Sequence, residues 1–201
     1  MRVLPPDEAG LHAALDVLER GGIVAHATET CYGLACDIAN PDAVALLFSV
    51  KRRPLDQPVS ALFPSIAEAK RYVEWPAQAE ALAKNLPGPL TLILHLRTDS
   101  PHPLFPTPNG GATIGVRVSS HPVAQALVER FGRPLTTTSA NIHGNPSPYS
   151  EEEILEQYSA REPSPDLLLS SGTLPHILPS TVVNIAGEKA AILRHGPLKL
   201  R

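Results

Sequence analysis

Short apolar runs of strand length alternate with amphipathic segments of helical length along the whole chain. Residues 7–20 carry leucine, alanine and valine at helical spacing and end at Gly21 and Gly22, after which an apolar run at 23–26 begins. A second amphipathic helix is expected at 122–131. This alternation predicts an α/β fold, a twisted mixed sheet flanked by helices.

The other expected elements follow the same order without an internal repeat. Further strands are expected at 59–63, 90–96, 112–118, 167–169, 180–185 and 190–193, and further helices at 43–49, 65–72, 77–85 and 151–157. Residues 100–111 are rich in proline and glycine and predict a long surface loop that could act as a lid. No linker separates two cores, so one domain over residues 1–201 is expected.

Composition excludes several classes of protein. A formal net charge of −3 and an aromatic content of 4% argue against a general nucleic-acid binder. Two cysteines are too few for a disulfide framework, and the spacing of His26, Cys31 and Cys36 fits no common zinc site. Neither a leader segment nor a run of membrane-spanning length is present in the sequence, so a cytoplasmic protein without a membrane partner is expected.

Two polar clusters interrupt the apolar pattern. Residues 28–33 place threonine, glutamate and threonine before a cysteine, a tyrosine and Gly33, and residues 136–139 are four hydroxyl side chains followed closely by Asn141. Both clusters also fit a strand and a turn, because threonine favours strands. Loops that carry such residues are nevertheless frequent binding sites, and glycine allows a close approach to the backbone.

Three cations, Lys51, Arg52 and Arg53, end an expected helix before Pro54. They fit a helix C-terminus, where positive charge is favoured, and they equally fit an anion clamp. Because strand ends of an α/β sheet converge on a crevice, these cations are expected to meet hydroxyl-rich segments from the rest of the chain. The segments expected to converge are 28–33, 51–54, 113–117, 137–141 with Ser147, and 180–194.

Such a crevice would hold Lys51, Arg53, Arg117 and Arg194 with several hydroxyl donors and almost no carboxylates. It would suit a polyanion such as a nucleoside triphosphate. The sequence has no Walker A pattern and no dinucleotide glycine fingerprint, so a standard phosphate loop is not expected.

Seven short motifs in this order resemble the YrdC/TsaC family of threonylcarbamoyl-adenylate synthases over nearly the whole chain. The motifs are residues 28–34, 51–54, 87–91, 115–118, 139–141, 180–183 and 193–196. The resemblance implies the short form of the family, a single YrdC-like domain with a basic concave crevice.

The resemblance also implies an activity. A member of this family is a nucleotidyltransferase that condenses L-threonine, bicarbonate and ATP, with Mg²⁺, into threonylcarbamoyl-AMP and pyrophosphate. The product would pass to downstream tRNA-modification proteins that form threonylcarbamoyladenosine, and weak binding of tRNA or double-stranded RNA is compatible with this function.

Site residues follow from the matching motif positions. The resemblance implies that threonine is held by Thr30, Arg117, Thr137 and Ser180. It implies that ATP is held by Arg53, Gln57, Thr113, Ser139, Asn141, Ser147 and Arg194, with Lys51 and Arg53 as the catalytic cations.

Four positions depart from the family pattern. Ala27 and Ser119 stand where proline is usual, Asn184 stands where an acidic residue is usual, and Leu62 stands where many members have histidine. Two other functions therefore stay open, a double-stranded RNA or tRNA-binding module and a paralogue of the same fold with a different substrate.

Overall fold

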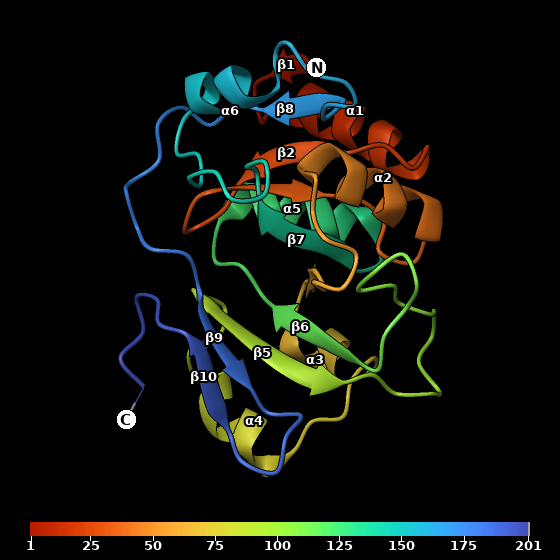
Figure 1. Ribbon diagram of the computed structural model, residues 1–201, viewed down its shortest axis with the longest axis vertical. Helices are drawn as coiled ribbons and strands as arrows, with labels where there is room; N and C mark the ends of the chain where they lie inside the picture. The colour runs from red at the N-terminus through yellow and green to blue at the C-terminus, as the bar shows by residue number, and fades with distance from the viewer. Residues whose placement is uncertain (201) are drawn as a thin grey trace.

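Ten strands form one mixed sheet in the computed structural model, which describes residues 1–200. Their order is β1-β8-β2-β3-β7-β4-β6-β5-β9-β10 (Figure 1). The strands are β1 Arg2–Leu4, β2 Val24–Ala27, β3 Tyr32–Ala35, β4 Ser60–Leu62, β5 Leu90–His95, β6 Thr113–Arg117, β7 Leu135–Ser139, β8 Leu167–Leu169, β9 Thr181–Asn184 and β10 Ala191–Arg194. The predicted α/β class with a mixed sheet is confirmed.

Six helices flank this sheet in the described part of the chain (Figure 1). They are α1 Glu8–Glu19, α2 Pro41–Lys51, α3 Ile66–Ala69, α4 Ala77–Ala83, α5 Pro122–Phe131 and α6 Glu151–Tyr158. Within residues 1–200, none of them has the length and apolar character needed to cross a bilayer.

Strand β7 changes its partner along its length. Residues 135–137 pair antiparallel with β4, whereas Thr138 and Ser139 pair antiparallel with β3. We call β1, β8, β2 and β3 the upper wing and β4, β6, β5, β9 and β10 the lower wing. The two wings therefore meet at the row of hydroxyl residues that the sequence places at 136–139.

Gly33 lets β3 approach β7 closely. A Cβ atom on Gly33 would lie 3.2 Å from the Thr138 carbonyl oxygen, which is closer than an ordinary contact. Gly33 is not among the glycines with positive φ. The structure therefore supports the close approach to the backbone that the sequence suggests for this glycine.

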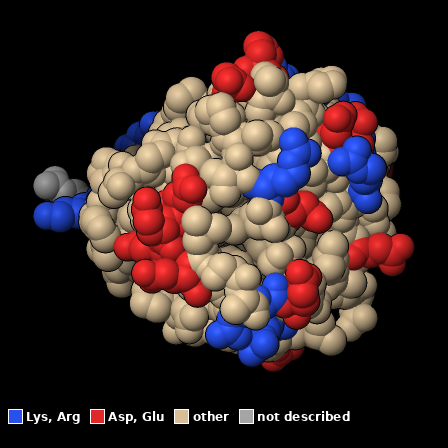
Figure 2. Space-filling model, turned by 90° about the horizontal axis from the view of Figure 1, so that it is seen from above, with Lys and Arg blue, Asp and Glu red and all other residues tan. Residues whose placement is uncertain are grey.

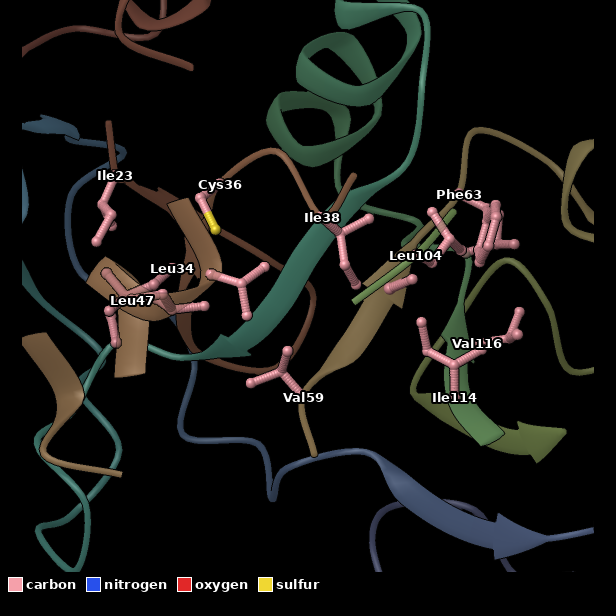
Figure 3. Packing of buried hydrophobic residues seen from close by; sticks show 14 of the residues in the cluster. Ile23, Leu34, Cys36, Ile38, Leu47, Val59, Phe63, Leu104, Ile114 and Val116 are labelled. Atoms are coloured by element: carbon pink, nitrogen blue, oxygen red, sulfur yellow. The ribbon is translucent and has the colours of Figure 1, made fainter. Parts of the chain in front are cut away.

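Apolar packing joins the wings on one side and holds two helices on the other. Leu34 and Leu47 belong to the larger buried cluster, which continues to Ile114 and Val116 of the lower wing (Figure 3). The smaller cluster lies under α1 and α5 and includes Leu62, which is fully buried there.

The helix α2 is longer than the sequence pattern predicts. Asn40 caps it, because Asn40 Oδ1 accepts hydrogen bonds from Asp42 N at 3.0 Å and Ala43 N at 3.3 Å. The cap explains why α2 begins at Pro41 instead of residue 43. At its other end α2 runs to Lys51 instead of residue 49, which places Lys51 in the last turn and Arg52 at the C-cap.

Three strands were not among those expected, and one expected helix is short. β7 is formed by the second polar cluster. β1 is a short edge strand, and β3 begins inside the polar cluster at Tyr32, because pairing with β2 and β7 outweighs its loop-like composition. The helix expected at 65–72 is reduced to the single turn of α3. Residues 100–111 contain neither helix nor strand, as expected for a loop.

Arg52 ends α2 with φ 50° and ψ 40°, the left-handed conformation that glycine adopts most easily. We expect Arg52→Gly to be more stable than Arg52→Ala by about 1 kcal/mol in the free energy of unfolding, since both lose the charge and only glycine relieves the backbone. Urea unfolding of the two variants measures this difference. Equal midpoints would show that the conformation costs nothing at this position.

Candidate active site

A crevice of about 260 Å³ opens beside the junction of the two wings. Its walls come from β4, β5, β6, β7, β9 and β10 together with the 28–33 segment and the loop after α2, so the predicted segments converge except for Ser147. Of the predicted site residues, those that line it are Thr30, Arg53, Thr113, Arg117, Thr137, Ser139, Ser180 and Arg194. The described residues contribute no carboxylate to this lining.

Lys51 does not reach the crevice. Its Nζ lies 2.5 Å from the Ser139 carbonyl oxygen, 2.7 Å from the Asn141 carbonyl oxygen and 3.4 Å from Asn141 Oδ1, and the residue is 1% exposed. Lys51 is therefore not among the residues that line the crevice, and its role as a catalytic cation stays a prediction. The ammonium uses its three donors on the protein and holds the 139–141 segment in place.

The charge of Lys51 is under opposing influences. Burial, followed by the nearby charge of Arg53, lowers its pKa to about 7. Its three oxygen acceptors favour the ammonium, because a neutral amine has only two protons to donate.

Three further predicted residues lie outside the crevice lining. Asn141 is occupied by the protein, since its Nδ2 donates to the carbonyl oxygens of Ile142 at 3.0 Å and Asn145 at 2.5 Å. Gln57 is exposed and contributes its carbonyl oxygen to Arg53. Ser147 lies on a neighbouring cavity that Tyr149 also lines.

Arg53 faces the crevice and also fixes its own loop. Its Nε donates to the Gln57 carbonyl oxygen at 2.7 Å and its Nη2 donates to the Pro58 carbonyl oxygen at 3.0 Å. Both contacts hold residues 54–58 around the guanidinium. Burial lowers the pKa of Arg53, but an arginine side chain stays charged in proteins.

Arg194 is held by the carbonyl oxygen and the hydroxyl of Ser180. Its Nε donates to the Ser180 carbonyl oxygen at 2.9 Å and its Nη2 donates to Ser180 Oγ at 3.0 Å. Ser180 Oγ also lies 2.8 Å from Thr91 Oγ1. Thr91 lines the crevice and was missed as a site residue, although it ends one of the motifs that carry the family resemblance.

At Gly196 the backbone lies against the backbone of residues 179–181, the segment that contains Ser180. A Cβ atom on Gly196 would lie 2.4 Å from both the Pro179 carbonyl oxygen and the Thr181 nitrogen, closer than any real contact. Gly196 N and Leu198 N both donate to Thr181 Oγ1 at 3.2 Å. The position of β10, and with it Arg194, thus depends on a residue without a side chain.

Arg117 is paired inside the protein. Its guanidinium contacts the carboxylate of Glu29, which a hydrogen bond from Ser119 also engages. Burial raises the pKa of Glu29, but Arg117 and Ser119 outweigh that effect and hold it below its ordinary value. One of the three arginine charges is therefore compensated, so the crevice carries less positive charge than the sequence predicts.

Two departures from the family pattern can now be placed. Leu62 is fully buried in the cluster under α5 and does not line the crevice. Ser119 is fully buried and contacts Glu29. A residue in the proline position has thus gained a polar contact beside the site.

His26 is a buried neutral group behind Glu29. Its Nδ1 lies 3.1 Å from the Ala27 carbonyl oxygen, and its Nε2 has no hydrogen-bond partner within residues 1–200. Burial lowers its pKa to about 4. His26 therefore contributes no positive charge to the site at neutral pH.

Comparison with known proteins gives consistent matches. A family model named Sua5/YciO/YrdC, described as telomere recombination, matches residues 16–196. A threonylcarbamoyl-AMP synthase of Vibrio cholerae is 38% identical over 151 residues, which cover 73% of this chain and 79% of the relative. A synthase of Bacillus subtilis is 31% identical over 96% of this chain, which spans about half of that longer relative, 55%.

Two solved structures share the fold. The Pyrococcus abyssi Sua5 structure complexed with L-threonine is 32% identical and has a TM-score of 0.85, with 98% of this chain and 57% of that chain covered. Escherichia coli YciO is 28% identical with a TM-score of 0.82, with 98% and 95% covered.

We expect His26 to destabilise the protein as the pH falls from 6.5 to 4. The unfolded histidine, with the higher pKa, binds a proton first, so unfolding is favoured by up to about 3 kcal/mol across this window. Urea unfolding at several pH values, compared with His26→Gln, measures the effect. Equal pH slopes for the two proteins would contradict it.

Lys51 and Arg53 are expected to differ in their effect on stability. Lys51→Met leaves buried carbonyl oxygens without a donor and should lower the free energy of unfolding by about 2 to 3 kcal/mol. Arg53→Met, the matched control, should cost about 1 kcal/mol, because its acceptors can reach water. Thermal and urea unfolding test this, and a reversed order would return Lys51 to the role of a ligand-binding cation.

Proposed function

The chain belongs to the Sua5/YciO/YrdC family, and from that premise we propose that it is a threonylcarbamoyl-AMP synthase. It would condense L-threonine, bicarbonate and ATP into threonylcarbamoyl-AMP, with release of pyrophosphate, for the modification of tRNA in the cytoplasm. The observation that carries the proposal is the crevice itself, where Arg53, Arg117 and Arg194 converge with hydroxyl donors and no lining carboxylate among the described residues.

The residues suit a reaction between anions. The amine of threonine forms an N–C bond to bicarbonate-derived carbon dioxide and loses a proton, which leaves with the hydroxide of bicarbonate as water. An oxygen of the resulting carbamate attacks the α-phosphorus of ATP while the bond to pyrophosphate breaks. Substrates and leaving group are all negative, so positioning and charge compensation are the main tasks of the protein. Arg53 and Arg194 would face the phosphates, and Arg117 would face the carboxylate of threonine.

The hydroxyl groups complete the proposed substrate contacts. Thr30, Thr137 and Ser180 lie on the same crevice as Arg117 and would contact threonine, with Thr91 as a further neighbour. The related Pyrococcus protein was solved with L-threonine, which supports this amino acid. Thr113 and Ser139 would contact the nucleotide. Lys51 would support this contact by holding the backbone of Ser139 in place.

Magnesium would enter with ATP as part of the substrate. Residues 1–200 contain no group of three or more histidine, cysteine or acidic side chains placed to hold a metal ion. The lining donors of the crevice are hydroxyls and arginines. This donor set fits a Mg²⁺ ion carried by phosphate oxygens and water.

Figure 2 bears on direct RNA binding. On the face that it shows, acidic side chains gather on the side where Figure 1 draws α6, and the lysine and arginine side chains form separate small groups. This face offers no continuous basic surface. Together with a net charge of −3, it favours the enzyme over an RNA-binding module.

The test is pyrophosphate release by the purified protein with ATP, Mg²⁺ and bicarbonate, with and without L-threonine. We expect release that requires threonine, is weaker with serine, and falls at least about tenfold in Arg53→Ala, which loses a charged phosphate contact. Arg71→Ala is the matched control, because Arg71 is an exposed arginine paired with Glu68 outside the crevice.

Mass spectrometry of the product identifies threonylcarbamoyl-AMP. Folded protein that releases no pyrophosphate with any amino acid would overturn the proposed function. Release with another amino acid in place of threonine would identify a paralogue with a different substrate.

A further inference from the structure

A partly buried carboxylate contacts the arginine that the proposed function assigns to the amino-acid substrate. Arg117 Nη2 donates to Glu29 Oε1 at 2.5 Å, and the two side chains are 10% and 12% exposed. The other oxygen, Glu29 Oε2, accepts a hydrogen bond from Ser119 Oγ. Each oxygen of Glu29 is therefore engaged by a different side chain.

Ser119 is oriented as a donor to Glu29. Its hydroxyl oxygen accepts a hydrogen bond from His121 N at 3.2 Å, which leaves its own proton for the carboxylate. Gln125 Nε2 donates to the Ser119 carbonyl oxygen at 2.8 Å and ties the residue to α5. Ser119 is thus fixed by contacts with the start of α5, and its hydroxyl in turn fixes the carboxylate of Glu29.

These contacts leave one part of Arg117 for a ligand. One N–H of Nη2 is used by Glu29, and Nε is buried without a partner. Among residues 1–200, Nη1 makes no hydrogen bond to the protein, and Arg117 lines the crevice. A long arginine side chain binds a ligand more tightly when its rotamer is already fixed in the free protein. Otherwise the binding free energy is reduced by the conformational entropy that the side chain loses when the ligand binds.

We propose that Glu29 and Ser119 are positioning residues that hold Arg117 with its free amino group toward the carboxylate of the amino-acid substrate. The proposal rests on the proposed synthase function. Two other roles for the same contacts make different predictions. If Glu29 competed with the substrate for Arg117, its removal would tighten amino-acid binding, and if the pair served folding alone, binding by the folded protein would not change.

The experiment measures the KM for L-threonine and for ATP together with kcat in the pyrophosphate-release assay. Ser119→Ala keeps the ion pair and removes the hydroxyl, so we expect the KM for threonine to rise about threefold to tenfold while kcat stays within about twofold. Glu29→Gln removes the charge and should raise the KM for threonine further, by about tenfold or more. In both variants the KM for ATP should be unchanged.

A matched control is Glu8→Gln. Glu8 is also a glutamate paired with an arginine, Arg130, but it is exposed and distant in sequence from the crevice residues. It should leave both KM values unchanged. Circular dichroism and urea unfolding confirm that each variant is folded, and calorimetric titration of threonine in the presence of a non-hydrolysable ATP analogue checks binding without turnover.

The possible outcomes separate the two proposals. A wild-type protein without threonine-dependent activity would refute the proposed function. An active wild type whose folded Ser119→Ala and Glu29→Gln variants keep the wild-type KM for threonine would refute the positioning role. Tighter threonine binding by Glu29→Gln would also refute it and would identify Glu29 as a competitor for Arg117.

Discussion

The change of partner along β7 is the constraint on which the rest of the structure depends. A strand that paired with one neighbour throughout would leave two separate sheets, whereas β7 joins β4 through residues 135–137 and β3 through Thr138 and Ser139. The hydroxyl row is thereby shared between the wings. Gly33 permits the close approach on one side of this junction, and Lys51 holds the segment that leaves it.

The four cations that the sequence places at one site have different tasks. Lys51 is used entirely by the protein, Arg53 divides its donors between its own loop and the crevice, and Arg194 is steadied by Ser180. Arg117 is held by a carboxylate. The arginines of the crevice therefore differ in how much of their charge the protein compensates. Each guanidinium that faces the crevice is fixed by contacts within the protein before substrate binds. Such preorganised charge is the condition for effective electrostatic catalysis.

Strand and helix periodicity predicted the fold class and most element positions, because apolar spacing decides which face of an element is buried. The convergence of distant motifs on one crevice was also predictable from strand ends. The depth of Lys51 was not, since it follows from the continuation of α2 to residue 51 and from contacts with carbonyl oxygens 88 and 90 residues away. The contacts of Glu29 with Arg117 and Ser119 likewise join segments distant in the sequence, for which a single sequence carries no signal.

Gly196 shows how selection could act on a site without acting on its chemistry. A side chain at this position would collide with the backbone of Pro179 and Thr181 and would displace β10. This displacement would move Arg194 away from Ser180, because the two residues contact each other where β10 lies beside the segment that precedes β9. A mutation at a residue with no functional group would then resemble the loss of two crevice-lining residues at once. Conservation of this position would reflect the short distance between two backbone segments.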